Sequence, residues 1–448
     1  MPLSLSMLTV ENLRRFWSHR VIRNVAMLYL MQLGTYVLPL LVLPYLSRVL
    51  SPEKYGTIMF AQVFMYYFWM LSDYGFTLTA TRQIAACRDD MPAVSRIFSN
   101  VMMARLFLMI IGFCIMIVVV LATPKMRMNW PLFLIAFLGV VGNTLFPQWL
   151  FQGLEKMEHM VFRDLTAKVL ALICIFIFVH SDKDYLLAAG LQPGGMVVAG
   201  ILSLFMVRRM TGVRFIWPAW GGVWGELKGS WPVFVSVAAS TTCPSTNMFL
   251  LGLTAPPEMV AYYANGFRLI VAIRMLVSPL VTAIYPYVSN IAVSSSKNAV
   301  GFVQRYAFLL SAPFLAVSVI LMAVAPLLVH VIFGPKYVYT GVLLQVMSPA
   351  PFLFAFSHCY CTYFMLVFGY DKQWSKLVLG SVVLNFAVLI PLMYSIQPTM
   401  ALAVTGTVVD ASIAVASYVF YRKHASEAAS RTIADSGTAI ADKVMAAE

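Results

Sequence analysis

The sequence has few charged residues and no long polar segment. Only 11% of its 448 residues are Asp, Glu, Lys or Arg, whereas 61% are hydrophobic. The mean hydropathy of +0.82 lies far above the range of soluble globular domains. The sequence therefore indicates a protein embedded in a membrane.

Residues that could form a catalytic or metal site are scarce. The six cysteines are scattered, Cys359 and Cys361 are too close together for an ordinary metal or redox pair, and no histidine completes a zinc pattern. No nucleophile–base pair, phosphate-binding glycine loop or carboxylate cluster is recognisable. We expect the cysteines to pack as small apolar residues. We expect no catalytic residue, no metal and no resident cofactor.

The sequence also shows no recognisable cleavable targeting segment and no long loop. The basic first 23 residues lead directly into a full-length apolar run, so we expect no signal peptide. All predicted loops are short. A membrane-embedded glycosyltransferase or polymerase would need a long catalytic loop outside the membrane, and the sequence offers none.

What the chain does have is a series of apolar runs, each long enough to cross a bilayer as a helix of about 20 residues. Twelve such runs lie at residues 24–49, 57–80, 98–122, 130–151, 161–180, 184–207, 230–252, 259–285, 305–329, 338–367, 374–395 and 399–421. We predict an all-α polytopic membrane protein with about 12 transmembrane helices. The run 161–180 is the weakest, and an eleven-helix protein with this segment at the membrane interface is the alternative.

The two halves of the chain resemble each other at matching places. The motif SPEKYG at 51–56 precedes the second run and PPEMVA at 256–261 precedes the eighth; GLEK at 153–156 and GYDK at 369–372 follow the fourth and tenth. Such repeats are typical of transporters, with substrate bound between them. We predict two six-helix lobes related by a pseudo-two-fold axis along the membrane normal. The predicted parts are a basic N-terminus (1–23), two lobes (24–207 and 230–421), a linker (208–229) and a tail (422–448).

The distribution of Lys and Arg predicts the orientation. If the N-terminus is cytoplasmic, 21 basic residues flank the runs on the cytoplasmic side and six on the other. We therefore predict that both termini are cytoplasmic. The net charge of +13 then reflects membrane topology, and we expect no nucleic-acid partner.

Proline residues fall within several runs. Pro147, Pro244, Pro286 and Pro349 lie in or near the fourth, seventh, eighth and tenth runs. A proline inside a helix removes a backbone hydrogen bond and bends the chain. These positions predict kinks, which serve either packing or alternating access.

Four basic residues lie deep inside the apolar runs, away from their ends: Arg105, Lys168, Arg268 and Arg274. A charge in the hydrocarbon layer costs about 3 kcal/mol or more and usually marks a functional path. The embedded charge is net basic, because only Asp73 and Asp410 lie equally deep among the acids. This excess predicts an anionic substrate, with the four basic residues as candidates for binding its head group.

The depths of these cations differ. A helix entering from outside near residue 259 would place Arg268 about 14 Å and Arg274 about 22 Å deep. They are separated by about 120° around a straight helix, so one can line a cavity while the other pairs or reaches the interface. Arg105 and Lys168 lie in the cytoplasmic half of their runs, where reaching the interface is the alternative to substrate binding.

The two embedded carboxylates are candidates for ion coupling, with a proton or sodium as the coupling ion. Asp410 lies near the centre of the last run, where an unpaired carboxylate would be neutral. Asp73 lies at the cytoplasmic end of its run. Its alternative role is an ion pair with Arg82 or Arg105.

Several motifs together resemble a known family. The stretch YVLPLLVLPYLSRVLSPEKYG at 36–56, the sequence SDYGF at 72–76, Arg82 and the Arg88-Asp89-Asp90 turn are similar to polysaccharide transporters of the multidrug/oligosaccharidyl-lipid/polysaccharide exporter superfamily. Within it, the chain most resembles O-antigen flippases of the Wzx type. The likeness is strong over residues 24–105 and weak in the second half.

The resemblance implies a flippase in the bacterial inner membrane. Its substrate would be an undecaprenyl-pyrophosphate-linked O-antigen unit, moved from the cytoplasmic to the periplasmic leaflet by ion-coupled alternating access. Arginine side chains would replace the hydration of the pyrophosphate through bidentate contacts. Membrane lipids, an O-antigen polymerase and a chain-length regulator are the further expected partners.

Other functions remain as alternatives. Flippases for capsule, teichoic acid or peptidoglycan precursors share the same chemistry. A multidrug exporter for cationic drugs would favour embedded carboxylates, which are outnumbered here. A membrane-embedded glycosyltransferase or polymerase is the third alternative.

Overall fold

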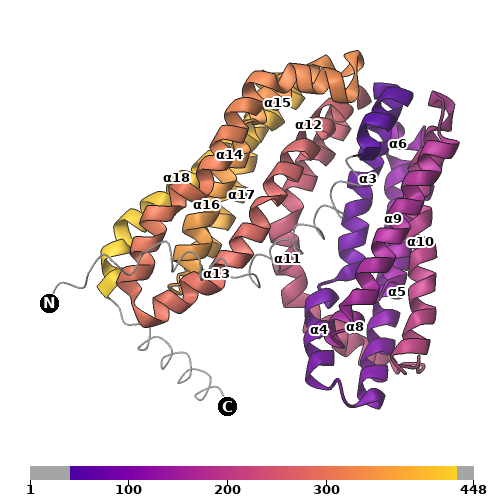
Figure 1. Cartoon of the computed structure of the whole chain (residues 1–448). Helices are drawn as coiled ribbons and strands as arrows, with labels where there is room; N and C mark the ends of the chain where they lie inside the picture. Colours follow the sequence, from indigo (N-terminus) through magenta and orange to yellow (C-terminus); the bar gives the residue numbers. More distant parts are fainter. Residues whose placement is uncertain (1–40, 431–448) are drawn as a thin grey trace. The chain divides into compact units, whose positions relative to one another are not determined.

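The structure is a computed structural model that describes residues 41–430 of the chain. Over that range it contains helices and short connections and no strand. The predicted all-α architecture is therefore confirmed. The described residues form two compact units, which we treat separately (Figure 1).

The first unit comprises the described residues up to Asn265 together with Val329–Tyr339. Residues 41–49 are helical and lead into the remaining helices of this unit. These are α3 (Pro52–Asp73), α4 (Phe76–Ala86), α5 (Met91–Ala122), α6 (Pro124–Arg127), α7 (Trp130–Leu145), α8 (Gln148–Gly153), α9 (Met157–Phe178), η2 (Asp182–Asp184), α10 (Tyr185–Met210) and α11 (Trp220–Thr254).

The second unit comprises Gly266–Leu328 and the described residues from Thr340 onward. Helices α12 (Pro257–Met275) and α14 (Ser296–Phe333) extend across the boundary, and η3 (Pro335–Tyr337) belongs to the first unit. The other helices are α13 (Val277–Ser294), α15 (Val338–Met347, whose first two residues belong to the first unit), α16 (Ala350–Tyr360), the π-helical η4 (Cys361–Leu366), α17 (Asp371–Ser395) and α18 (Pro398–Ser430).

Helix starts follow from local sequence. Ser51 caps α3, its hydroxyl accepting a hydrogen bond from the amide of Lys54 at 3.3 Å, and Pro52 occupies the first helical position. Asp90 caps α5 in the same way through the amide of Ala93 at 3.0 Å. Both caps satisfy backbone donors that a helix leaves unpaired at its start.

Helices α7 and α10 pack closely against each other in the first unit. A Cβ atom on Gly142 would lie 2.5 Å from the backbone of Met196, and one on Gly200 would lie 2.8 Å from the carbonyl oxygen of Gly142. Small residues allow such close approach in membranes, where packing and not water drives helix association.

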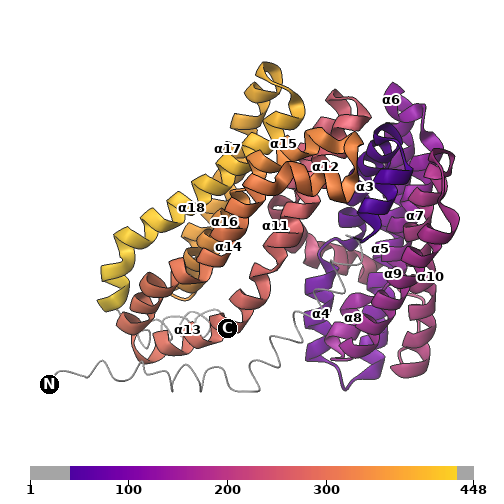
Figure 2. The same cartoon turned by 45° about the horizontal axis from the view of Figure 1, so that its top comes forward.

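Helices α17 and α18 lie side by side in the second unit, as Figures 1 and 2 both show. One apolar core in this unit is formed by buried side chains of α13, α14, α16, η4 and α18, and it includes Tyr363, Phe364 and Tyr421. This aromatic cluster packs the π-helical turn into the unit.

Two of the predicted proline sites coincide with breaks. Pro147 lies between α7 and α8, and Pro349 between α15 and α16. Pro244 and Pro286 instead lie inside continuous helices, because a helix can lose one hydrogen bond and continue. The break between α3 and α4 has another cause: Tyr74 and Gly75 adopt positive φ angles of 48° and 77°.

The helices agree with the predicted spans. Each predicted run from residue 57 onward coincides with one helix or with consecutive helices, and the run 24–49 lies mostly outside the described residues. Seven helical segments within 41–430 are long and apolar enough to cross a membrane. The weak run 161–180 coincides with helix α9.

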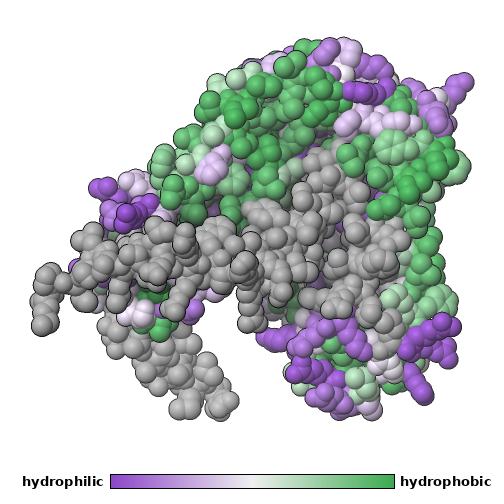
Figure 3. All heavy atoms as spheres, viewed as in Figure 1, coloured by the Kyte–Doolittle hydropathy of each residue, from purple (hydrophilic) through white to green (hydrophobic). Residues whose placement is uncertain are grey.

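The outer surfaces of the helices are apolar. Ile110 and Val118 of α5 expose 58% and 67% of their area, and Ile320 of α14 exposes 61%. On the face shown in Figure 3, hydrophobic residues cover large parts of the coloured surface, and hydrophilic residues gather at its margins. This pattern suits helices surrounded by hydrocarbon, and the chain is a multi-pass membrane protein. The predicted lobe and linker boundaries stay predictions.

Candidate functional site

Arg105 is at the centre of a buried polar cluster in the first unit. Its side chain is only 2% exposed, and its guanidinium donates to the carbonyl oxygens of Phe146 at 2.9 Å, Asn143 at 3.0 Å and Ser72 at 3.4 Å. These carbonyls belong to the ends of α7 and α3, where helices leave acceptors unpaired and the dipole is negative. Arg105 thereby joins two helix breaks.

Asp73 lies beside this arginine. Its Oδ1 atom is 3.8 Å from Nη2 of Arg105 and accepts a hydrogen bond from the hydroxyl of Thr77 at 2.7 Å. The ion pair with Arg105 was one of the two pairings predicted for this residue. The roles of Arg105 in substrate binding and of Asp73 in ion coupling stay predictions.

A second buried pair lies in the second unit. Nη2 of Arg274, near the end of α12, donates to Oδ2 of Asp410 in α18. The guanidinium also lies 5.3 Å from the ring centre of Phe354 in α16, within the range of a cation–π contact. The two charged side chains are 19% and 14% exposed.

One nitrogen of this pair remains available for hydrogen bonding. Nε of Arg274 is buried and has no hydrogen-bond partner among the described residues. A guanidinium has five N–H groups, so Arg274 can hold Asp410 and still donate to an additional acceptor. The arrangement can accept an anion without first losing its carboxylate.

The remaining predicted cations are half-buried. Arg268 lies on α12, six residues before Arg274, and Lys168 lies on α9. Each unit therefore contains two of the four: Arg105 and Lys168 in the first, Arg268 and Arg274 in the second. Their predicted roles in binding an anion are not tested by this arrangement.

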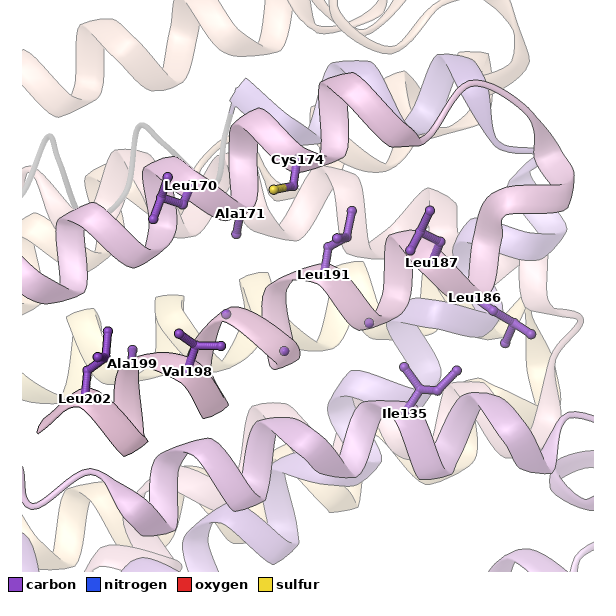
Figure 4. Close-up of a pocket in the computed structure, with 13 residues that line it drawn as sticks. Ile135, Leu170, Ala171, Cys174, Leu186, Leu187, Leu191, Val198, Ala199 and Leu202 are labelled. Carbon is purple, nitrogen blue, oxygen red and sulfur yellow. The ribbon is translucent and has the colours of Figure 1, made fainter. Parts of the chain in front are cut away.

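An apolar pocket that the sequence analysis did not identify lies in the first unit. It has a volume of about 730 Å³ and is lined by residues of α7, α9 and α10 (Figure 4). Its lining includes Ile135, Leu170, Leu191 and Leu202 and the glycines at 190, 194 and 195. The glycine content of α10 was the one available signal, but the volume depends on how three helices pack.

Within the described residues, no group of three or more His, Cys, Asp or Glu side chains could hold a metal ion. The five cysteines whose side chains the structure describes are free, and Cys359 and Cys361 are buried in the core of the second unit. The aromatic residues Tyr66 and Trp69 lie with ring centres 5.4 Å apart.

The sequence matches a family model described as "Polysaccharide biosynthesis protein" over residues 21–292. A protein of Escherichia coli (strain K12) named "Putative O-antigen transporter" is 31% identical over 370 residues, covering 83% of this chain and 89% of that protein. One of Shigella dysenteriae with the same name is 28% identical over 374 residues, covering 83% and 93%.

Solved structures show the same fold. An inward-facing multidrug resistance MATE family transporter of the MOP superfamily matches with a TM-score of 0.67 at 16% identity, covering 89% of this chain and 95% of that one. The lipid II flippase MurJ in an inward closed conformation matches with a TM-score of 0.62 at 12% identity, covering 89% and 90%.

The matching family and the names of these relatives indicate a membrane transporter and not an enzyme. The chain belongs to the polysaccharide biosynthesis protein family. The family resemblance found in its first spans is confirmed.

Proposed function

We propose that this transporter is a flippase for a lipid-linked saccharide, and specifically for an undecaprenyl-pyrophosphate-linked O-antigen unit. The observation that carries the proposal is the 31% identity to a protein named "Putative O-antigen transporter", extending over 83% of the chain. The excess of embedded basic residues supports it, because a pyrophosphate needs cations to replace its water within the membrane.

Within the membrane, the pyrophosphate would bind to the arginines of α12. Arg268 is half-buried and lies six residues before Arg274, whose buried Nε has no hydrogen-bond partner among the described residues. An arginine binds a phosphate through two parallel hydrogen bonds, which a lysine cannot do. The direction of transport is from the cytoplasmic to the periplasmic leaflet of the bacterial inner membrane.

Ion coupling would use Asp410. An anion that draws Arg274 towards itself weakens the bond between Arg274 and Asp410, and the buried carboxylate then gains a proton or sodium ion. Release of the anion on the other side restores the pair and expels the ion. Asp73 is the second candidate, through its contact with Arg105.

The function can be tested in cells that make O-antigen but lack their own flippase. Expression of this chain should restore surface O-antigen and remove the lipid-linked units that accumulate inside. Restored growth of cells depleted of their lipid II flippase, without restored O-antigen, would instead identify a peptidoglycan-precursor flippase. Restored resistance to cationic drugs alone would identify an exporter.

Coupling can be tested in the same background. Asp410→Asn should slow export more than Asp410→Glu, because only the glutamate can carry a proton. Vesicle transport that is unaffected by an imposed pH gradient and by an imposed sodium gradient would exclude ion coupling while leaving the flippase proposal in place.

An O-antigen polymerase and a chain-length regulator would act on the transported unit in the outer leaflet.

A further inference from the structure

The apolar pocket of the first unit has the size of a ligand site. Its volume of about 730 Å³ lies within the range of about 300–1,000 Å³ that binding pockets occupy. Its side chains come from three helices of one unit, and Figure 4 shows α9 and α10 on either side of it. It is therefore not a packing defect between two helices.

Glycines give the pocket its width. Where α10 lines it, Gly190, Gly194 and Gly195 present no side chain, and a Cβ atom on Gly194 would have no neighbour within 4 Å. A branched chain needs such width, because methyl groups project from it at regular intervals.

The pocket opens to its surroundings along its length. Leu170, Leu187, Val198 and Leu202 line it and expose 56%, 44%, 57% and 52% of their area. These residues lie in apolar helical segments, so the opening faces hydrocarbon and not water. A lipid chain could enter from the bilayer without crossing an aqueous phase.

One end of the pocket leads towards positive charge. Leu170 and Leu202 lie at the same end in Figure 4. Arg209 follows Leu202 by two helical turns on nearly the same face of α10, about 10 Å further along the axis, and Arg208 precedes it. Both arginines are exposed. The groove thus complements an amphiphile with an apolar chain and an anionic head.

From this complementarity we infer that the groove between α9 and α10 binds the isoprenoid chain of the lipid-linked saccharide, with its pyrophosphate near Arg208 and Arg209. The inference rests on the proposed function, which supplies a carrier with a long branched chain and an anionic head. The chain would remain beside the protein in hydrocarbon while the head group is loaded.

The inference is tested with the purified full-length protein in vesicles and a polyprenyl pyrophosphate that carries a photoreactive diazirine on its chain. Illumination should label peptides of α9 and α10 that contain Leu170 and Leu202. Undecaprenyl phosphate should compete for this labelling, whereas an excess of phosphatidylglycerol should not. Arg209→Gln should weaken labelling, and Lys228→Gln, which removes an exposed cation elsewhere, should not.

Filling the groove gives the sharpest comparison. Gly194→Leu should reduce labelling about tenfold, since a leucine displaces several methylene contacts. Gly380→Leu is the matched control, because Gly380 is an exposed glycine of α17 whose Cβ would also meet nothing within 4 Å. Val198→Phe fills the groove from its exposed rim and gives a second variant if Gly194→Leu fails to fold.

Several outcomes would overturn the inference. Undiminished labelling in both filled variants would show that the chain binds elsewhere. Competition by phosphatidylglycerol would identify an ordinary bilayer lipid, and a dimer lost in Gly194→Leu would identify a second copy packed on the small residues. Wild-type transport without groove labelling refutes only this inference, whereas groove labelling without transport refutes only the proposed function.

Discussion

At the scale of single residues, Arg105 stabilises the fold of the first unit through backbone acceptors. Arg105→Ala would leave the carbonyls of Ser72, Asn143 and Phe146 without their donor in a buried site. We expect a loss of about 3 kcal/mol or more of folding free energy. Arg105→Lys should lose less, because an ammonium group can still reach some of these oxygens. The loss is measured by thermal unfolding of the purified variants in detergent, with Arg214→Ala at an exposed position as the control. An unchanged unfolding midpoint for Arg105→Ala would show that Arg105 does not stabilise the first unit.

The pair of Arg274 and Asp410 should behave as a coupled unit. Arg274→Gln or Asp410→Asn alone leaves one buried charge without its partner, which costs more than the neutral double variant. A double-mutant cycle of unfolding midpoints should give a coupling of about 1–3 kcal/mol. Additive effects would show that the contact contributes nothing to stability.

Sequence reasoning found the embedded charges but not all their partners. Arg105, Arg268, Arg274 and Lys168 stand out because charge is rare in apolar runs. The acceptors of Arg105 are mainly backbone carbonyls, which any residue supplies and which leave no mark in a sequence. The contact between Arg274 and Asp410 joins residues 136 positions apart, and only the packing of α12 and α18 brings them together.

At the scale of elements, the segment that precedes α11 is held against α5 by polar contacts. The hydroxyls of Ser95 and Ser99 accept hydrogen bonds from the amides of Arg214 and Ile216 at 3.1 and 2.8 Å. Val223 and Leu227 then join the apolar core beside α4 and α5. The segment predicted as a linker is therefore packed against α4 and α5 from residue 214 to residue 227.

Glu226 makes this docking depend on pH. It accepts a hydrogen bond from Nε2 of Gln83 at 3.1 Å, and burial raises the pKa of its carboxyl while that bond partly offsets the shift. A raised pKa means that the folded state binds the proton more tightly than the unfolded state. The protonated Glu226 carboxyl therefore contributes to the free energy of unfolding at low pH. This contribution is lost as the pH rises from 4.5, the ordinary pKa of a glutamate, through the raised pKa of Glu226.

We predict that Glu226→Gln makes thermal stability less dependent on pH. Unfolding midpoints of the wild type should fall more than those of the variant between about pH 5 and pH 8. Glu53→Gln, at an exposed position of α3, is the matched control. Identical pH profiles for wild type and Glu226→Gln would show that the carboxyl has no such effect.

The positions of the helices could be predicted because apolar runs and prolines mark them directly. Pro147 and Pro349 lie at breaks as expected, whereas the break at Tyr74 and Gly75 depends on two positive φ angles. The groove along α10 could not be predicted, because its volume is set by how closely α9 and α7 approach its glycines.

At the scale of the whole molecule, the excess of Lys and Arg on one side predicts the orientation. A cytosolic reporter fused after residue 425, in the last turns of α18, should be active, and a periplasmic reporter at the same site should be silent. Fusions in the turn at residues 180–184 should give the opposite pattern. The reverse result at both sites would invert the orientation, and with it the side from which substrate is loaded.

The proposed movement of a lipid-linked saccharide across the bilayer can be measured with purified protein in vesicles. A fluorescent undecaprenyl-pyrophosphate oligosaccharide placed in both leaflets should become fully accessible to an impermeant quencher only when the protein is present. Arg268→Ala, at equal protein level, should slow this about tenfold or more, and Arg268→Lys should slow it less. Quenching that stops at the outer leaflet with wild-type protein, as in protein-free vesicles, would contradict the account.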